Sequence, residues 1–169
     1  MSNIILVGFM GTGKTTVGKM LENATGLPLI DMDQLIEQEA GTSISEIFAN
    51  EGEAHFRRLE RAMAQKLATR SNHIISTGGG IVLNPDNLTD FARNGLVVCL
   101  TASPDTILNR VRNDKNRPLL AGDKEQQIYD LLQQRQPLYD AIPFQVATDP
   151  YTPEQITEII LKHFRSHTD

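Results

Sequence analysis

A glycine-rich segment near the start of the chain limits the possible folds more than any other feature of the sequence. Residues 8–15 read Gly-Phe-Met-Gly-Thr-Gly-Lys-Thr, which fits the phosphate-loop spacing G-x-x-x-x-G-K-[ST]. The apolar run Ile4–Val7 precedes this segment, and a helical pattern over Lys14–Thr25 follows it. A strand, a loop and a helix in this order are the context that the motif requires. The sequence therefore predicts an α/β enzyme that binds ATP with Mg²⁺.

Each part of the predicted loop has a defined task. Glycines allow successive backbone N–H groups to approach phosphate oxygens, and the dipole of the following helix favours their negative charge. Lys14 is expected to neutralise charge on the β- and γ-phosphates, and the Thr15 hydroxyl is expected to bind Mg²⁺. The residues expected to contact the nucleotide here are Gly11, Thr12, Gly13, Lys14, Thr15 and Thr16.

Short apolar runs alternate with helical patterns along the rest of the chain. Strands are expected at Ile4–Val7, Leu27–Ile30, His73–Ser76, Leu96–Leu100 and Phe144–Ala147. Helices are expected at Lys14–Thr25, Gln34–Ala40, Ile44–Asn50, Glu53–Arg70, Pro85–Arg93, Pro104–Arg112, Gln126–Gln136 and Pro153–His163. This alternation predicts a parallel sheet covered by helices on both faces. Ligands of such sheets bind beyond the carboxyl ends of the strands, so the chemistry is expected just after Val7, Ile30 and Ser76.

The length and the charge of the chain exclude several classes of protein. The 169 residues, 40% of them hydrophobic, are enough for one domain with a full core. The net charge of −5 and the lack of a basic patch argue against a nucleic-acid partner. No apolar run approaches the roughly 18 residues of a membrane helix, and the first residues lack the features of a signal peptide. We therefore expect a cytoplasmic protein in which the single Cys99 belongs to the core.

Two aspartates follow the second expected strand, in the segment Asp31-Met32-Asp33. Residues two apart in an extended chain face the same way, so both carboxylates are expected to point toward the phosphate end of the sheet. One would hold Mg²⁺ through water, and the other would accept a proton from a substrate hydroxyl. The alternative is that Asp33 simply caps the following helix.

Glycines and arginines supply candidates for binding a second ligand. The segment Thr77-Gly78-Gly79-Gly80 follows the third expected strand, and it either allows close approach by a ligand or forms a flexible loop. Arg57 and Arg58 lie on the longest expected helix, and Arg135 ends a later one. A planar guanidinium suits bidentate binding of a carboxylate. The alternative is an ion-paired helix face, in which Glu60 pairs with Arg57.

Two polar segments near the end of the chain allow weaker predictions. Residues 113–123 have no clear period and contain Arg117, so they form either an ordinary surface loop or a lid that brings this arginine onto the transferred phosphate. The start, Asn113-Asp114, differs from the guanine-selecting Asn-Lys-x-Asp pattern, which argues against a GTPase. His163 and His167 have the spacing of a metal site, but they lack the zinc-protease pattern and are interpreted as ordinary surface residues.

Together these motifs closely resemble those of the shikimate kinase family, in the family's order and over essentially the whole chain. They are Gly8–Thr16, Asp31-Met32-Asp33, Glu51-Gly52-Glu53-Ala54-His55-Phe56-Arg57, Gly78-Gly79-Gly80, Arg117-Pro118-Leu119-Leu120 and Arg135-Gln136-Pro137-Leu138-Tyr139. The phosphate loop alone is shared by many families, but the combination is specific. The resemblance implies a three-layer α/β/α P-loop kinase fold of one domain, residues 1–169, with a five-stranded parallel sheet in the order 2-3-1-4-5. It also implies a substrate-binding segment at about 32–61 and a lid at about 112–124.

The resemblance implies a reaction in which ATP phosphorylates the 3-hydroxyl of shikimate, a step toward chorismate and the aromatic amino acids. By resemblance, Asp33 binds the ring hydroxyls, and Arg57 and Arg135 grip the carboxylate. The glycines Gly78, Gly79 and Gly80 approach the substrate, with a backbone N–H donated by the middle one. The implied catalytic residues are Lys14, Asp33 and Arg117.

The nucleotide side of the site is also implied by the resemblance. Arg117 meets the ATP phosphates, and Arg110 and Pro153 sandwich the adenine. Asp31 is the partner of Thr15 at Mg²⁺, because the strand His73–Ser76 lacks the acidic residue that usually ends the second nucleotide motif.

Two other functions fit part of the sequence. Another small-molecule kinase, such as a gluconate or nucleoside monophosphate kinase, would share the phosphate loop and the lid. It has no obvious need for Asp33, Arg57 and Arg135 together with the three glycines. A non-catalytic ATP-dependent switch would bind ATP without turnover. The expected partner is the small-molecule substrate shikimate, with no nucleic acid and no membrane, and the expected state is a monomer.

Overall fold

Five parallel strands form one sheet in the order β2-β3-β1-β4-β5, which confirms the expected order. The computed structural model describes residues 2–113 and 124–168 of the chain. The strands are β1 (Asn3–Val7), β2 (Leu29–Asp31), β3 (Ile74–Ser76), β4 (Gly95–Thr101) and β5 (Gln145–Ala147). In the ladder, Ile5 of the central strand lies between Ile75 and Val97.

Helices connect the strands and begin where polar side chains cap them. They are α1 (Lys14–Thr25), α2 (Met32–Ala40), α3 (Ile44–Glu51), α4 (Glu53–Ala68), α5 (Pro85–Ala92), α6 (Pro104–Arg112), α7 (Lys124–Asp140) and α8 (Pro153–Ser166), with a short 3₁₀ helix, η1 (Gly79–Leu83). Asn84, Ser103 and Thr152 accept hydrogen bonds from backbone N–H groups of the turns that follow them. Each stands before a proline at the first helical position, which confirms the expected starts of these three helices.

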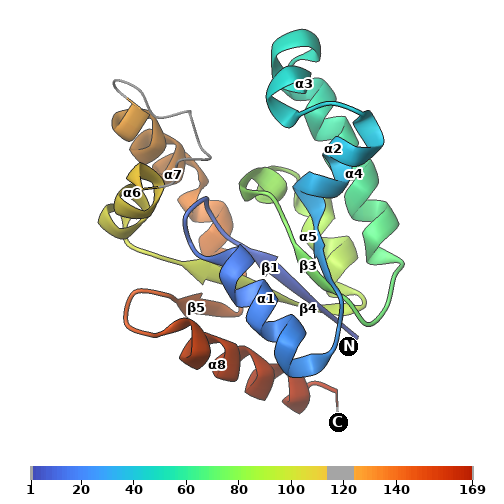
Figure 1. Cartoon of the computed structure of the whole chain (residues 1–169), viewed down its shortest axis with the longest axis vertical. Helices are drawn as coiled ribbons and strands as arrows, with labels where there is room; N and C mark the ends of the chain where they lie inside the picture. Colours follow the sequence, from blue (N-terminus) through green and yellow to red (C-terminus); the bar gives the residue numbers. More distant parts are fainter. Residues whose placement is uncertain (1, 114–123, 169) are drawn as a thin grey trace.

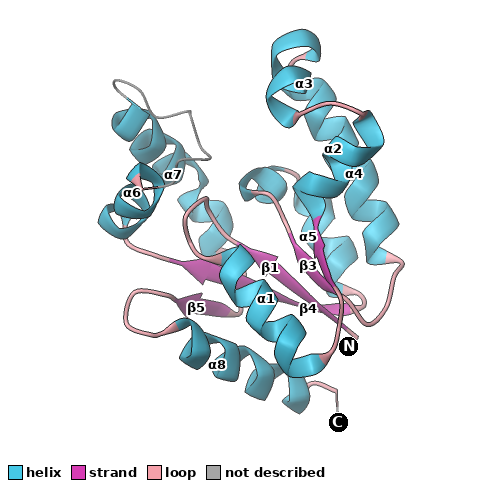
Figure 2. Ribbon diagram, viewed as in Figure 1, coloured by secondary structure: helices cyan, strands magenta, loops and turns pink. Residues whose placement is uncertain are grey.

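The hydrophobic core lies on both faces of the sheet, as a doubly covered parallel sheet requires. Alternate side chains of β1 point to opposite faces. Ile5 and Val7 join a cluster with residues of α4, α5, α6 and α7, whereas Ile4 and Leu6 join a cluster with residues of α1 and α8. Figures 1 and 2 show one of the resulting layers, in which α1 and α8 lie next to each other against the same face of the sheet. Cys99 is buried in the first cluster, as expected, and burial raises the pKa of its thiol to about 12.

Several boundaries differ from the expected ones, among them those of β2, α2 and α7. The strand β2 begins at Leu29 and not at Leu27, because Pro28 has no N–H to donate to the ladder. The helix α2 begins at Met32, two residues earlier than expected. The helix α7 continues past Pro137 to Asp140, where the Gln145 side chain donates to carbonyls of the last turn and beyond.

The carboxyl ends of β1, β2 and β3 form the edge on which the site is built. The phosphate loop follows β1, α2 follows β2, and the three glycines follow β3. Thr77 joins two of these ends, because its backbone N–H and its hydroxyl both donate to the Leu6 carbonyl, at 3.0 and 2.9 Å. The pair α2 and α3 rises on one side of this edge, and α6 with α7 rises on the other (Figure 1). In the described part of the chain, no helix is long and apolar enough to cross a membrane.

Candidate active site

The phosphate loop has the backbone shape that its glycines were expected to permit. Gly13 has a φ of 94° and forms the N-cap of α1, a conformation that side chains disfavour. At Gly8, φ is 154°, and an added Cβ would lie 2.5 Å from the Leu100 carbonyl oxygen. The loop therefore passes close to β4 and turns directly into α1, so the N-terminus of that helix faces the space above the loop.

Side chains of the loop hold it together from inside. The Thr12 hydroxyl donates to the Phe9 carbonyl at 2.8 Å. The Lys14 ammonium donates to the Gly8 and Phe9 carbonyls, at 2.5 and 3.0 Å. Lys14 therefore lies folded over its own loop, where a polyphosphate would meet its charge. Thr15 and Thr16 are exposed in the first turn of α1, as binding of a nucleotide from solvent requires.

The two aspartates do not lie in one extended segment, which corrects the expected geometry. Asp31 ends β2 and is the N-cap of α2, where its carboxylate accepts from the Gln34 N–H at 3.2 Å. Asp33 lies in the first helical turn, so it is not the cap. Because a helix turns about 100° per residue, the side chains of these residues diverge. Asp31 is exposed, whereas Asp33 turns inward toward the glycines.

Asp33 lies against the first of the three glycines. A Cβ added at Gly78 would lie only 2.7 Å from Asp33 Oδ1, so a glycine is needed there for the carboxylate to fit. Burial raises the pKa of the Asp33 carboxyl above its ordinary value of 3.8, and the charge of Asp31 raises it further. The charges of Lys14 and Arg57 oppose this rise. Asp33 is thus electrostatically coupled both to the phosphate loop and to the arginine on α4.

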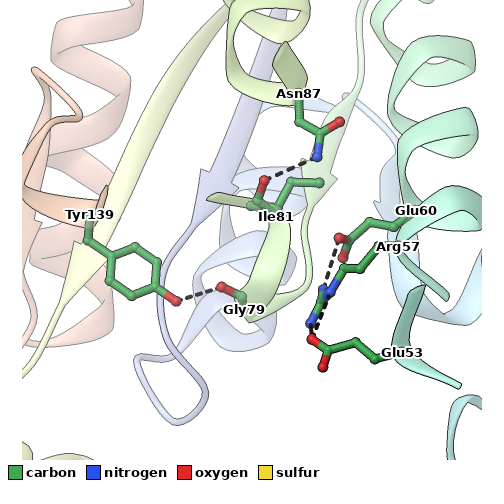
Figure 3. A network of polar contacts seen from close by, with 7 residues as sticks. All are labelled: Glu53, Arg57, Glu60, Gly79, Ile81, Asn87 and Tyr139. Atoms are coloured by element: carbon green, nitrogen blue, oxygen red, sulfur yellow. Dashed lines mark hydrogen bonds and ion pairs between the residues drawn. The ribbon is translucent and has the colours of Figure 1, made fainter. Parts of the chain in front are cut away.

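Arg57 is held in an ion-paired cluster on α4 (Figure 3). Its guanidinium donates to Glu60 Oε1 at 2.9 Å and to Glu53 Oε1 at 3.3 Å. The pairing with Glu60, which the sequence offered as the alternative to a carboxylate-binding role, is therefore present. The same guanidinium lies directly on the glycine segment, because a Cβ at Gly80 would be 2.2 Å from Arg57 Nη1. The neighbouring Arg58 points elsewhere and is exposed.

Arg135 approaches the same glycines from the opposite side of the site. It lies within α7 and not at its end, and the side chain is 9% exposed. Its Nη1 would be 3.6 Å from a Cβ at Gly79, which is ordinary contact distance. One helical turn later, the Tyr139 hydroxyl donates to the Gly79 carbonyl at 2.5 Å (Figure 3). Tyr139 belongs to the motif Arg135–Tyr139, but the sequence did not single it out as a site residue. Its spacing of four residues from Arg135 places both side chains on one helix face.

Three buried polar atoms in this region lack a hydrogen-bond partner among the described residues. They are Asp33 Oδ1, Glu60 Oε2 and Arg135 Nε. Two of these atoms are carboxylate acceptors and one is a guanidinium donor, and the Asp33 and Arg135 side chains lie against the glycines. Buried polar groups are nearly always paired, so a polar ligand that binds at the glycines would complete their hydrogen bonding. A small molecule that carries hydroxyl groups and a carboxylate matches this combination.

Charged and hydroxyl groups also lie over the other side of the phosphate loop. Arg110 of α6 donates to the Gly11 carbonyl at 2.9 Å and to the Thr148 hydroxyl at 3.3 Å. It therefore joins the phosphate loop to the chain that follows β5. Pro153 is the exposed first residue of α8, just beyond that connection. Arg117 and most of the expected lid, residues 114–123, lie outside the described residues.

The candidate magnesium ligands fit a site that water and phosphate complete. Thr15 offers a hydroxyl at the start of α1, and Asp31 offers an exposed carboxylate at the end of β2. Across residues 2–113 and 124–168, no group of three or more histidines, cysteines, aspartates or glutamates could hold a metal by itself. Mg²⁺ keeps several waters and binds substrate phosphates, so two oxygen donors suit it. His163 is not part of a metal group, and its ring stacks on Phe144 at 3.9 Å between centroids.

Comparison with known proteins gives one consistent result. A family model described as shikimate kinase matches residues 10–165. The shikimate kinase of Pelotomaculum thermopropionicum is 44% identical over 168 residues, which are 99% of this chain and 98% of the relative. The shikimate kinase of Caldanaerobacter subterraneus subsp. tengcongensis is 43% identical over 165 residues, 97% of this chain and 96% of the relative. The solved structure of shikimate kinase from Acinetobacter baumannii in complex with shikimate has a TM-score of 0.89 at 37% identity and covers 99% of this chain and 94% of that one.

Proposed function

Because the chain belongs to the shikimate kinase family, we propose that it transfers the γ-phosphoryl group of ATP to the 3-hydroxyl of shikimate, giving shikimate 3-phosphate and ADP. The observation that carries this function is the convergence of two sets of groups on one edge of the sheet. A phosphate loop lies after β1, and a cluster with two arginines and a buried aspartate surrounds the glycines after β3. The product serves the synthesis of chorismate and the aromatic amino acids.

The donor half of the proposed site is the phosphate loop with α1. Backbone groups from Gly11 to Thr16 would hold the phosphates, and Lys14 would neutralise charge on the transferred group. The position of Lys14 over the Gly8 and Phe9 carbonyls supports this role. Mg²⁺, when bound by Thr15 and Asp31, supplies further charge neutralisation. Arg117 is proposed to meet the phosphates, and Arg110 with Pro153 to enclose the adenine.

The acceptor half of the proposed site is built around the glycines. Arg57 and Arg135 reach these glycines from α4 and α7, so together they would bind the substrate carboxylate. Backbone groups of Gly78, Gly79 and Gly80 would contact the ring. Asp33, buried against Gly78, would align the 3-hydroxyl and accept its proton. Since the transition state of phosphoryl transfer is loose, alignment and charge neutralisation should matter more than proton transfer.

The proposed enzyme acts as a single domain over residues 1–169, as a cytoplasmic monomer. Its substrate-binding segment, about 32–61, corresponds to α2, α3 and the first half of α4, and the lid corresponds to about 112–124.

The decisive experiment is a coupled assay of ADP release with and without shikimate. We expect turnover that depends on shikimate, with gluconate, nucleoside monophosphates and other hydroxylated acids as inactive controls. Turnover with gluconate or a nucleotide, and none with shikimate, would contradict this proposal and indicate a gluconate or nucleoside monophosphate kinase. ATP binding without turnover of any acceptor would instead indicate a switch.

A further inference from the structure

Tyr139 is a buried hydroxyl group for which the proposed reaction has no direct use. Its side chain is 2% exposed, although it lies on the same α7 face as Arg135. The hydroxyl donates to the carbonyl of Gly79, a residue 60 positions away in the chain, at 2.5 Å (Figure 3). Burial raises the pKa of Tyr139 from its ordinary value of 10.0 to about 12, while the charge of Arg135 and a hydrogen bond with it oppose the rise. A tyrosine is protonated at neutral pH at either value, so the hydroxyl can donate.

The ring of Tyr139 contacts the donor half of the site, while the hydroxyl contacts the acceptor half. The ring meets Phe9 of the phosphate loop edge to face, with centroids 6.4 Å apart and planes at 82°. It also lines a cavity of about 40 Å³ beneath the loop, together with Thr12 and Gln136. A single side chain thus touches both the segment that would hold ATP and the segment that would hold the acceptor.

Hydrogen bonds, and not the backbone preference of its residues, fix the conformation of the glycine segment. Glycines have wide conformational freedom, so consecutive glycines do not define their own peptide orientation. The peptide unit is rigid and trans, so holding the Gly79 carbonyl in one direction fixes the Gly80 N–H in the opposite direction. The Ile81 carbonyl is held separately, by the Asn87 side-chain amide at 3.1 Å (Figure 3). The turn of η1 also secures the segment, because the Ile81 N–H donates to the Gly78 carbonyl at 3.2 Å. Among the side chains of the described residues, Tyr139 is the one whose hydrogen bond reaches the Gly79 carbonyl itself.

We propose that Tyr139 is a positioning residue, whose hydroxyl sets the orientation of the Gly79–Gly80 peptide for acceptor binding and whose ring supports the phosphate loop. The proposal rests on the proposed function, since it takes shikimate as the acceptor. The hydroxyl and the ring of Tyr139 are then expected to have separable effects. Loss of the hydroxyl alone weakens acceptor binding, and loss of the ring weakens nucleotide binding as well.

The test compares Tyr139→Phe, which removes only the hydroxyl, with Tyr139→Leu, which also removes the ring. For Tyr139→Phe we expect the KM for shikimate to rise about 3- to 10-fold, as loss of one hydrogen bond implies, with the KM for ATP changed less than about twofold. For Tyr139→Leu both KM values should rise. The matched control is Tyr129→Phe on the same helix, because Tyr129 is exposed and its hydroxyl accepts a hydrogen bond from its neighbour Gln133 on that helix.

Binding of shikimate measured by calorimetry, well below the melting temperature, separates positioning from a loss of folded protein. A general structural role predicts equal rises in both KM values for Tyr139→Phe, and this result would overturn the proposal. Unchanged shikimate affinity in Tyr139→Phe would overturn it too. If the unaltered protein shows no turnover with shikimate, the proposed function fails instead, and the wild-type assay reports this independently of the variants.

Discussion

At the scale of single residues, Asp33 combines a chemical role with an energetic cost. Its carboxylate is buried against Gly78, with Oδ1 unpaired among the described residues. The pKa of this carboxyl is raised from 3.8, so the folded state holds the proton more tightly than the unfolded state. This tighter proton binding stabilises the folded state below pH 3.8, and the stabilisation is lost as the pH rises through the folded-state pKa of Asp33. Above the folded-state pKa, the ionised carboxylate therefore destabilises the fold relative to an uncharged side chain of the same size.

Asp33→Asn should consequently raise stability while lowering activity. The amide is nearly the same size but carries no charge, so it aligns the substrate hydroxyl less well and cannot accept its proton. We expect the melting temperature at pH 7 to rise, by about 2–4 °C for each 1 kcal/mol gained, and kcat to fall by about 10²–10⁴-fold. Calorimetry at pH 7 and pH 4 tests the electrostatic cause, since the gain in melting temperature should shrink at the lower pH. A variant that is less stable at pH 7 would contradict this account.

The guanidinium of Arg135 is a buried charge that the proposed function pairs with the substrate carboxylate. It is 9% exposed, and its Nε has no hydrogen-bond partner among the described residues. Arg135→Ala should raise the KM for shikimate by about 10- to 100-fold, because hydrogen bonds to charged groups contribute about 1.5–3 kcal/mol. Steady-state kinetics with each substrate varied in turn will measure this effect. The control is Arg58→Ala, which removes an exposed arginine. Equal loss of ATP and shikimate binding in Arg135→Ala would argue against a carboxylate-binding role.

At the scale of elements, α4 contacts the glycine segment directly and also through α5. Arg57 contacts Gly80, and one turn later Arg61 donates to Asn87 and Asp90 of α5, at 3.1 and 2.7 Å. Asn87 in turn holds the Ile81 carbonyl. The position of the arginine that would bind substrate and the path of the glycine segment are therefore linked through α5.

Gly80→Ala should disturb this fit without unfolding the protein. The added Cβ would lie 2.2 Å from Arg57 Nη1, so the guanidinium must move away. Because the displaced atom is the end of a flexible side chain, we expect only a small change in melting temperature. The KM for shikimate should rise about 10-fold or more, as the loss of a charged hydrogen bond implies, whereas the KM for ATP should change little. Steady-state kinetics will measure the two KM values, and a thermal unfolding curve will measure the melting temperature. An unchanged KM for shikimate would show that Arg57 can relocate without loss.

At the scale of the whole molecule, the proposed donor and acceptor groups come from different parts of the fold. The phosphate loop and α1 lie over the centre of the sheet, while α2, α4, η1 and α7 carry the proposed acceptor groups. Asp33 is coupled to both parts, since the charges of Lys14 and Arg57 both lower its pKa. Only Thr15 and Asp31 are proposed to bind Mg²⁺, and neither is proposed to touch shikimate.

Removal of divalent ions should therefore stop the reaction without preventing acceptor binding. With EDTA we expect ADP release to fall by at least about 100-fold, since metal-ion neutralisation contributes several kcal/mol to such reactions. The affinity for shikimate alone, measured by calorimetry in the same buffer, should stay within about twofold. Restored turnover on adding Mg²⁺ is the control for damage by the chelator. Loss of shikimate binding on chelation would contradict the assignment of Asp31 and Thr15 to the donor side only.

The sequence by itself determined the features that depend on neighbouring residues. The phosphate loop, the capped starts at Asn84, Ser103 and Thr152, and the alternation of strands and helices were all predicted, because spacing, capping and periodicity are local properties. The pairing of Arg57 with Glu60 was foreseen for the same reason, since the two residues lie three positions apart on one helix.

Only the tertiary structure decided which side chains meet across the fold. Asp31 and Asp33 were expected to point the same way, but the early start of α2 caps the helix with Asp31 and turns Asp33 onto Gly78. The bond from Tyr139 to Gly79 joins residues 60 positions apart, and no local pattern contains such a contact. The phosphate loop was evident from eight consecutive residues because it binds through its own backbone. The acceptor side requires side chains from several elements, so its geometry exists only once the sheet has brought those elements together.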